Sequence, residues 1–181
     1  MRPAARTIET TRLLLRPFAQ GDAAAYAAIC GDPQVMRYIG AGAVQTAAEA
    51  WRAIAFFLGH WQLRGFGMWA LEHRDSGVLL GRVGFHHPPD WPDFELGWVV
   101  ARAQWGHGFA REAAAAALRH AFEHMRRERV ISLIRPGNRR SIAVAEAIGE
   151  RLSGSTELLG GEALVYAATR RPGTAWQPGG D

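Results

Sequence analysis

The chain has 181 residues, 48% of them hydrophobic, so it is long enough for one domain with a substantial core and short for two. All 21 basic residues are arginine, which excludes lysine-dependent phosphate loops and Schiff-base mechanisms, and a net charge of +4 is too small to argue for nucleic acid. The single cysteine, Cys30, excludes an internal disulfide. The sequence shows no charged-then-apolar leader and no apolar run of the roughly 18 residues that a membrane span needs. We therefore expect a cytoplasmic protein without membrane contact.

The first half of the chain predicts one strand and two main helices. Residues 11–18 (TRLLLRPF) form the strand, and Asp22 is positioned to cap a helix that runs through Cys30 and is followed by a short helical turn. Thr46 and Glu49 fit a capping box, in which each side chain bonds a free backbone N–H at the start of a helix; Gly65 ends that helix. Helical spacing predicts a buried stripe made of Trp51, Ile54, Leu58 and Trp61.

The second half predicts strands over 66–73, 78–86 and 94–100, a glycine loop, a helix over 108–127, a strand over 130–134, a helix over 138–148, and strands over 151–157 and 163–169. This order predicts an α+β fold with a single mixed, mostly antiparallel sheet of about seven strands and about four helices. A helix joins strands 94–100 and 130–134, so these two strands should be parallel neighbours. We expect one domain over residues 8–170 and a disordered glycine- and proline-rich tail over 171–181.

The most informative segment is the glycine loop, Trp105-Gly106-His107-Gly108-Phe109-Ala110, which lies between a strand and an alanine-rich helix. Its two glycines allow a sharp turn and a close approach of the backbone to a ligand. The following helix begins with unpaired N–H groups and the positive end of its dipole, an arrangement that favours phosphate. The segment therefore predicts a phosphate-bearing ligand held by main chain.

Three segments together resemble the GCN5-related N-acetyltransferase (GNAT) superfamily, in particular its branch of ribosomal-protein N-terminal acetyltransferases. They are Thr10–Pro17, Glu95–Trp98 with the glycine loop through Ala113, and Asn138–Ile142 ending in Ala147-Ile148-Gly149. The chain departs from the superfamily pattern with Trp105 where Gln or Arg is usual, and with Glu150 where an aromatic often follows the last glycine. A tyrosine proton donor is also absent from the 138–149 helix.

The resemblance implies transfer of an acetyl group from acetyl-CoA to a primary amine, without a metal, on a sheet whose two parallel strands splay apart to bind the cofactor. The backbone of Gly106, His107, Gly108, Phe109 and Ala110, beside Trp105, would hold the pyrophosphate, and the pantetheine would pair with the free edge of strand 94–100. An N–H near Val99 or Val100 would stabilise the thioester oxygen as it becomes negative. Asn138 would contact the pantetheine or cap its helix, and Arg139 or Arg140 would contact a phosphate.

Glu95 is the candidate base that takes a proton from the amine, with a solvent-facing strand carboxylate as the alternative. Ser141 is the candidate acid that returns a proton to the leaving thiolate, with a hydrogen bond at the helix start or a cofactor contact as its alternatives. The acceptor pocket should be built by residues 36–44, the 51–65 helix and the 87–93 loop, where Trp91 could form a wall. The acceptor is left open between a protein α-amine, ribosomal or other, and a small amine, and the protein is either a monomer or a homodimer.

Two other functions are weighed against this enzyme: a non-catalytic acyl-CoA-binding sensor or scaffold, and a basic RNA-binding protein. The run of Arg126, Arg127, Arg129, Arg135, Arg139 and Arg140 could bind RNA, although the chain lacks the aromatic-in-basic pattern expected for stacking on bases. His120-Ala121-Phe122-Glu123-His124 matches a short zinc-protease motif that arises easily by chance. His86 and His87 are neighbours on a strand and point to opposite faces, so they cannot chelate together.

Overall fold

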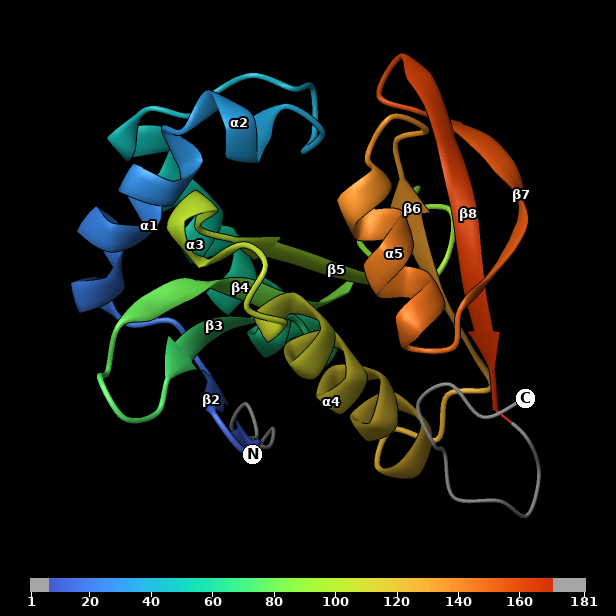
Figure 1. Cartoon of the computed structure of the whole chain (residues 1–181), viewed down its shortest axis with the longest axis horizontal. Helices are drawn as coiled ribbons and strands as arrows, with labels where there is room; N and C mark the ends of the chain where they lie inside the picture. Colours follow the sequence, from blue (N-terminus) through green and yellow to red (C-terminus); the bar gives the residue numbers. More distant parts are fainter. Residues whose placement is uncertain (1–6, 171–181) are drawn as a thin grey trace.

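One eight-stranded sheet runs through residues 7–170, the part of the chain that this computed structural model describes (Figure 1). The tail predicted over 171–181 lies outside the described residues. The strands are β1 (Ile8–Glu9), β2 (Leu13–Arg16), β3 (Met68–His73), β4 (Leu79–His86), β5 (Glu95–Val100), β6 (Arg129–Ile134), β7 (Arg151–Leu158) and β8 (Gly161–Thr169), in the spatial order β1-β2-β3-β4-β5-β6-β8-β7.

Every pair of neighbouring strands is antiparallel except β5 and β6, which are parallel. The mixed, mostly antiparallel α+β fold and its parallel pair are therefore confirmed. The strand beyond the seven expected is β1, whose two residues are too few to give a periodic signal.

Five α-helices cover the two faces of the sheet in the described residues. They are α1 (Ala23–Cys30), α2 (Pro33–Met36), α3 (Ala47–Arg64), α4 (Phe109–Glu123) and α5 (Arg139–Ala147). One core cluster joins α4 to residues such as Trp69, Leu71 and Leu96, while the other joins α1 and α3 to Met68, Ala70 and Val99. Successive side chains of β3 and β5 thus point to opposite faces of the sheet and join different core clusters, as the pleat of a strand requires.

The α3 helix begins as predicted, because Thr46 and Glu49 form both bonds of the capping box, and it ends at Gly65 with φ 78°. The predicted buried stripe is wrong in part: Trp51 and Leu58 are 49% and 41% exposed. Ile54 is buried as predicted, and the other buried residues of the helix are Ala50, Phe57 and His60. Apolar residues lie almost all round this helix, so periodicity alone does not choose the face that meets the sheet.

Helix α4 packs closely on the sheet because its inward residues are mostly alanine. Ala113, Ala114, Ala117 and Ala121 are all fully buried. The helix ends at Glu123, earlier than the predicted residue 127, and the chain then turns through Arg126 at φ 54°. A non-glycine residue in the left-handed region stops a helix.

Candidate active site

Strands β5 and β6 separate soon after they begin. Their one register pair in the described residues joins Glu95 to Ile131, and the Ile131 N–H donates to the Phe94 carbonyl at 3.0 Å. Further along, a side chain bridges the gap, because the Ser132 hydroxyl donates to the Leu96 carbonyl at 2.8 Å. The splayed parallel pair that the resemblance implies is therefore present.

The backbone of β5 alternates between its two neighbours. Phe94 and Leu96 direct their carbonyls toward β6, whereas Val99 is paired with Arg82 of β4. Since alternate residues share a direction, the N–H of Val100 faces the gap and that of Val99 faces β4. Of the two residues predicted to supply an N–H to the thioester oxygen, Val100 has the better direction.

The glycine loop and the start of α4 form one wall of a groove of about 630 Å³. Gly106 and Gly108 have φ of 82° and 80°, a conformation that side chains disfavour, and Gly108 precedes α4 without a side-chain cap. The loop residues lining the groove are Trp105, Gly106, Gly108, Phe109 and Ala110. His107 is not among them; its exposed ring stacks on Phe109 with centroids 5.8 Å apart.

Four arginines surround this groove: Arg37, Arg111, Arg139 and Arg140. The guanidinium of Arg140 lies 4.2 Å above the ring of Trp105, which accounts for an aromatic at that position of the loop. Arg139 and Arg140 therefore line the groove as predicted, while Arg37 and Arg111 were not anticipated. Uncapped helix N–H groups with four cations fit a ligand that carries several phosphates.

The start of α5 contributes Asn138 and Ser141, which border both this groove and a second cavity. Asn138 is the N-cap of α5, and its Oδ1 accepts the Ser141 N–H at 3.3 Å. The capping alternative for Asn138 is thus correct, and it leaves the side-chain NH₂ group of Asn138 for a ligand. The Ser141 side chain stands where the two cavities meet.

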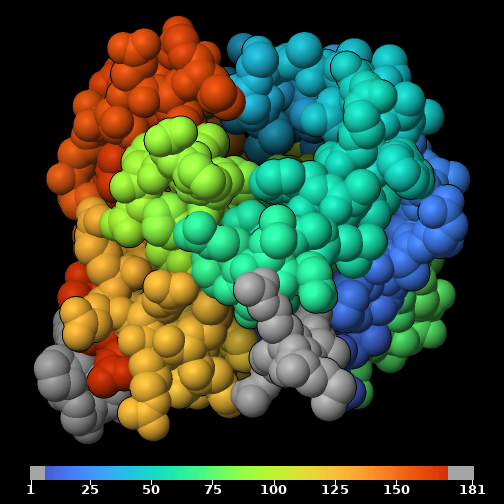
Figure 2. Space-filling view, turned by 180° about the vertical axis from the view of Figure 1, so that it is seen from behind, coloured from blue at the N-terminus to red at the C-terminus, as the bar shows by residue number. Residues whose placement is uncertain are grey.

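The second cavity has a volume of about 420 Å³ and opens on the far side of the splay. Figure 2 shows a hollow there, between the β7–β8 hairpin (orange) and residues around 36–50 (cyan), above the 87–93 loop (green). All three segments predicted for the acceptor pocket line this cavity, through Met36, Tyr38, Ile39, Gly40, Ala53, Phe56, Phe57 and Trp91. Residues near the hairpin tip, Leu158 and Leu159, were not anticipated.

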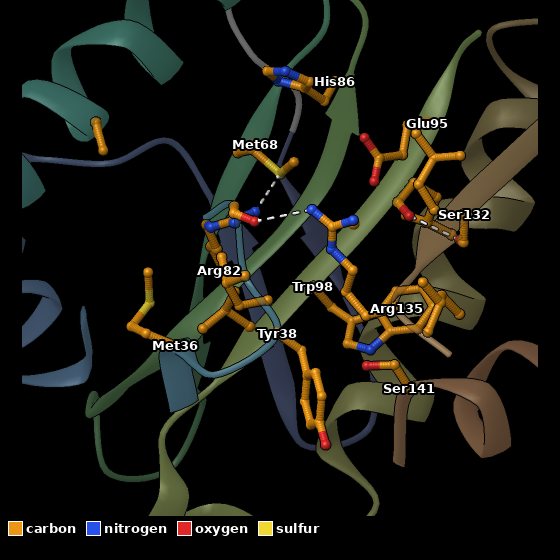
Figure 3. A pocket seen from close by; sticks show the side chains of 18 of the residues that line it. Met36, Tyr38, Met68, Arg82, His86, Glu95, Trp98, Ser132, Arg135 and Ser141 are labelled. Carbon is orange, nitrogen blue, oxygen red and sulfur yellow. Dashed lines mark hydrogen bonds between the residues drawn. The ribbon is translucent and has the colours of Figure 1, made fainter. Parts of the chain in front are cut away.

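Strands β4 and β5 form the floor of this cavity, which is the candidate acceptor cavity (Figure 3). Gly84 and Gly97 are cross-strand partners, so the centre of the floor has no side chains. A Cβ on Gly84 would lie 2.4 Å from the Gly67 carbonyl oxygen, which explains why glycine is required there. On either side of the two glycines, His86 is paired with Glu95, and Arg82 with Val99.

Glu95 is half-buried in the wall of the acceptor cavity and is not a solvent-facing carboxylate. Its Oε2 accepts a hydrogen bond of 2.7 Å from the indole N–H of Trp91. Burial raises the pKa of Glu95 to about 7, against the opposing effects of that hydrogen bond, the charge of Arg82 and the backbone of Leu133. A carboxyl with such a pKa can accept and release a proton near neutral pH.

His86 is the histidine of the adjacent pair that borders the acceptor cavity. Its ring stacks on that of His60 with centroids 5.9 Å apart. Burial, followed by the positive charge of Arg82, lowers the pKa of His86 to about 4. The side chain is therefore neutral at neutral pH and adds no charge to the cavity.

Glu150 was recognised only as a departure from the superfamily pattern, yet it lies fully buried behind the splay. The Ser132 hydroxyl is 3.1 Å from Glu150 Oε1, and Oε2 has no hydrogen-bond partner in residues 7–170. Burial, and secondarily the charge of Glu95, raises the pKa of Glu150 to about 8, against the Ser132 hydrogen bond. The Ser132 hydroxyl has one proton for two acceptors, so a protonated Glu150 suits this geometry.

The motifs that point to other functions find no matching geometry. His120 and His124 stack on each other with ring centroids 4.9 Å apart, and residues 7–170 contain no group of three His, Cys, Asp or Glu side chains arranged to hold a metal. Within the same residues, no helix is both long and apolar enough to cross a membrane.

The predicted arginine run does not make a single basic surface. Arg127 packs over the ring of Phe94 at 4.2 Å, and Arg129 pairs with Asp93. Arg135 turns into the candidate acceptor cavity, while Arg139 and Arg140 border the groove beside the glycine loop. The run therefore serves several separate contacts.

The model of a protein family described as acetyltransferase (GNAT) domain matches residues 12–151, which cover the splay, the glycine loop and most of the residues that line the two cavities. The chain belongs to the GNAT acetyltransferase family. Its relatives include YnaD of Bacillus subtilis, named as an N-acetyltransferase, which is 32% identical over 147 residues (81% of this chain and 84% of YnaD). The groove with four arginines is lined mainly by residues within the matched range.

Solved structures agree with this assignment. An acetyltransferase from Agrobacterium tumefaciens is 32% identical and superposes with a TM-score of 0.83 over 94% of this chain and 98% of its own. RimJ of Mycobacterium smegmatis, in complex with a CoA disulfide, has a TM-score of 0.73 over 87% of this chain and 81% of its own. At 22% identity, this likeness shows that RimJ and this chain share a fold, and it says nothing about the acceptor of this chain.

Proposed function

We propose that this protein transfers the acetyl group of acetyl-CoA to a primary amine by direct attack of the amine on the thioester. The observation that carries the proposal is that the groove with four arginines, which would hold acetyl-CoA, and the acceptor cavity share a wall. Tyr38, Ile39, Trp98, Val99, Asn138 and Ser141 border both. Two substrates that enter from opposite sides would meet there, and proximity alone lowers the barrier of a two-substrate reaction.

On the cofactor side, the chain offers three kinds of contact. The N–H groups at the start of α4 would bind the pyrophosphate, and Arg139 or Arg140 a further phosphate. The free edge of β5 would pair with the pantetheine amides as if with another strand. The Val100 N–H would stabilise the negative charge that develops on the thioester oxygen.

On the acceptor side, Glu95 would take the proton that an ammonium group must lose before it attacks. An N-terminal α-amine has a pKa of about 7.7–8.0 and a lysine side chain about 10.4, so a carboxyl with a pKa of about 7 is better matched to an α-amine. A protein or peptide N-terminus satisfies this condition, whereas the amine of a free amino acid is more basic because of its neighbouring carboxylate.

Ser141 would return a proton to the leaving thiolate, since its hydroxyl lies at the junction of the two cavities. Tyr38 is a second candidate for this role, supplied by the 36–44 segment where α5 offers no tyrosine. Its hydroxyl lies 3.1 Å from the point where a Cβ on Gly137 would be, next to Asn138 (Figure 3). The direct route requires no metal.

The first test is thermal unfolding with acetyl-CoA, CoA or NAD at matched concentrations, followed by CoA release in the presence of amines. A ligand at about 100 times its Kd adds about 2.7 kcal/mol, which raises Tm by roughly 5–10 °C for a domain of this size. We expect the rise with acetyl-CoA and CoA and not with NAD. Stabilisation without CoA release for any amine would favour a non-catalytic acyl-CoA sensor instead.

A further inference from the structure

The charges that face the acceptor cavity are unbalanced. Two arginines, Arg82 and Arg135, border it, and Glu95 is the one acidic side chain among the described residues that line it. Glu95 is also the proposed base, which must be free to take a proton. Because Glu95 would be engaged by the amine, the rest of the cavity wall carries the uncompensated positive charges of Arg82 and Arg135.

Arg82 holds its charge in the cavity without a carboxylate partner. Its Nε donates to the Tyr26 hydroxyl at 3.0 Å, its Nη1 contacts Met68 Sδ at 3.4 Å, and its guanidinium lies 5.4 Å above the ring of Phe57. No acidic residue in the described part of the chain forms an ion pair with it. Because a guanidinium among apolar side chains is costly to leave unpaired, this position favours an anionic ligand.

Arg135 adds a second positive charge from the opposite wall (Figure 3). Its guanidinium donates to the carbonyls of Leu158, Glu162 and Gly40 at 2.8, 3.1 and 3.4 Å, and to no carboxylate in residues 7–170. Neutral carbonyls orient the guanidinium and leave its net charge in place. Arg135 thus ties the β7–β8 hairpin to the 36–44 segment and makes the cavity more positive.

Arg82 and Glu95 converge on the glycine floor beside the methyl group of Met68. A Cβ on Gly97 would lie 3.4 Å from Met68 Cε, 3.9 Å from Arg82 Nη1 and 3.9 Å from Glu95 Oε1, although Arg82 and Glu95 form no ion pair. A ligand above Gly97 can therefore contact the guanidinium and the carboxylate together. An α-amino acid, whose amine and carboxylate are attached to one carbon, has the required spacing.

The remaining walls are apolar and aromatic, and include Met36, Phe56, Phe57, Met68, Trp91 and Trp98. A cavity of about 420 Å³ lined in this way has room for one bulky apolar side chain. Polyamines and other polycations would meet two arginines and a single carboxylate. A peptide N-terminus would offer an amine without a nearby carboxylate.

We propose that the acceptor is a free α-amino acid with a large apolar side chain, whose amine faces Glu95 and whose carboxylate is bound by Arg82. This inference rests on the proposed function. The ammonium group gives a proton to Glu95, the amine nitrogen forms a bond to the acetyl carbonyl carbon, and the C–S bond of the thioester breaks. The thiolate takes up a proton, so the products are the N-acetyl amino acid, CoA and one proton.

The test compares each amino acid with its own amide, because the pair differs only in the carboxylate. Rates of CoA release are measured for phenylalanine against phenylalaninamide and for methionine against methioninamide, with spermidine and a phenylalanine-initiated tripeptide as further acceptors. Loss of one charge-assisted contact is worth roughly 10- to 100-fold in affinity, so we expect kcat/KM for the acid to exceed that for the amide by about this factor. The amine of the amide is the less basic of the two, so more of it is unprotonated at neutral pH. This difference alone would favour the amide, and it therefore works against the expected preference for the acid.

The variant Arg82→Met keeps an unbranched side chain and removes the charge. We expect it to lower kcat/KM for phenylalanine by about 10- to 100-fold while the value for phenylalaninamide changes far less. Any change in the pKa of Glu95 affects both acceptors alike, so the acid-to-amide ratio isolates the carboxylate contact. Arg119→Met, on the exposed face of α4 and away from both cavities, is the matched control. Stabilisation by acetyl-CoA shows that each variant is folded.

Equal use of acid and amide by the unaltered protein would overturn the inference, and so would a preference for the tripeptide or spermidine; in either case the proposed acetyl transfer would still stand. An unchanged acid-to-amide ratio in folded Arg82→Met would overturn the role of Arg82. Failure of every amine to release CoA, despite stabilisation by acetyl-CoA, would instead overturn the proposed function and the inference with it.

Discussion

At the scale of single residues, Glu95 offers the clearest prediction, because its pKa of about 7 lies within the working pH range. If its carboxylate is the base, kcat/KM should rise with pH through about 7 and then level off, as the group loses its proton. Glu95→Gln should lower kcat by about 100-fold or more and remove this inflection, since general-base catalysis contributes about 10²–10⁴-fold. The measurement is the pH profile of CoA release for both proteins.

Acetyl-CoA binding provides the control for Glu95→Gln, because the substitution lies outside the groove proposed for acetyl-CoA. Stabilisation by acetyl-CoA should be unchanged. A variant with full kcat at every pH would show that water alone accepts the proton and that Glu95 only lines the cavity.

Glu150 should make stability depend on pH in the opposite sense to an ordinary ion-paired carboxylate. Its pKa is about 8 in the folded protein against an ordinary 4.5, so between these values the folded state holds a proton that the unfolded state has released. Raising the pH therefore favours unfolding, by up to about 1.4 kcal/mol per pH unit. Glu150→Gln should remove this contribution and flatten the fall in unfolding free energy between pH 5 and about 8.

Denaturant unfolding at several pH values tests this prediction, with Glu123→Gln as the control because Glu123 is exposed on α4. The control should follow the unaltered protein. If Glu150→Gln also follows it, the carboxyl of Glu150 is ionised or solvated in the folded protein, and the inferred protonated state is wrong.

At the scale of elements, the start of the sheet holds the glycine loop in place. Glu112, in the first turn of α4, accepts hydrogen bonds from the Thr10 hydroxyl (2.6 Å) and from the backbone N–H and Nε of Arg12 (2.9 and 2.7 Å). Arg12 Nη1 also donates to the His107 carbonyl at 2.9 Å. The resemblance between the opening strand and its family counterpart therefore has a physical basis, since these residues clamp the loop that is proposed to bind the phosphates.

Glu112→Ala should loosen this clamp. Arg12 is partly exposed, so we expect only about 1–2 kcal/mol of lost stability, together with weaker acetyl-CoA binding because the loop must be ordered again when the ligand binds. Calorimetric titration with CoA and thermal unfolding measure the two effects. Glu123→Ala on the same helix is the control, and equal CoA affinities for the two variants would contradict the clamp.

Local features of the chain could be predicted where a few consecutive residues decide them. The capping box at Thr46, the turn at Gly106 and the parallel pair β5–β6 follow from short patterns and from connectivity. The buried face of α3 did not follow, because apolar residues such as Trp51 and Phe57 lie all round it and the sheet selects among them. Periodicity ranks the faces of a helix only when one of them is polar.

The residues of the acceptor cavity were even harder to predict from local sequence patterns than the buried face of α3. Glu95 and Ser141 were found because they belong to recognisable motifs, whereas Arg82 belongs to none. Arg82 becomes a cavity residue only because β4 pairs with β5 and two glycines open the floor between them. Such sites depend on cross-strand register, which a single sequence specifies poorly, although an arginine inside an apolar strand (LLGRVGF) was a usable signal.

At the scale of the whole molecule, the proposed function has two substrates that enter from opposite sides of the splay and meet at one wall. This arrangement predicts a sequential mechanism, in which both substrates are bound before any product leaves. Initial rates at varied acetyl-CoA and amine should give intersecting double-reciprocal lines. Parallel lines would indicate an acetyl-enzyme and would contradict direct attack.

An acetyl-enzyme formed on the thiol of Cys30, which borders the acceptor cavity and is 1% exposed, would produce parallel lines. Burial raises the pKa of its thiol above the ordinary value of 9.0, so the reactive thiolate is scarce at neutral pH. We therefore expect Cys30→Ala to keep kcat within about twofold and to lose at most about 1–3 kcal/mol of stability from altered packing. Loss of turnover in a folded Cys30→Ala, or an acetyl group on Cys30 by mass spectrometry after incubation with acetyl-CoA alone, would replace direct transfer with a covalent route.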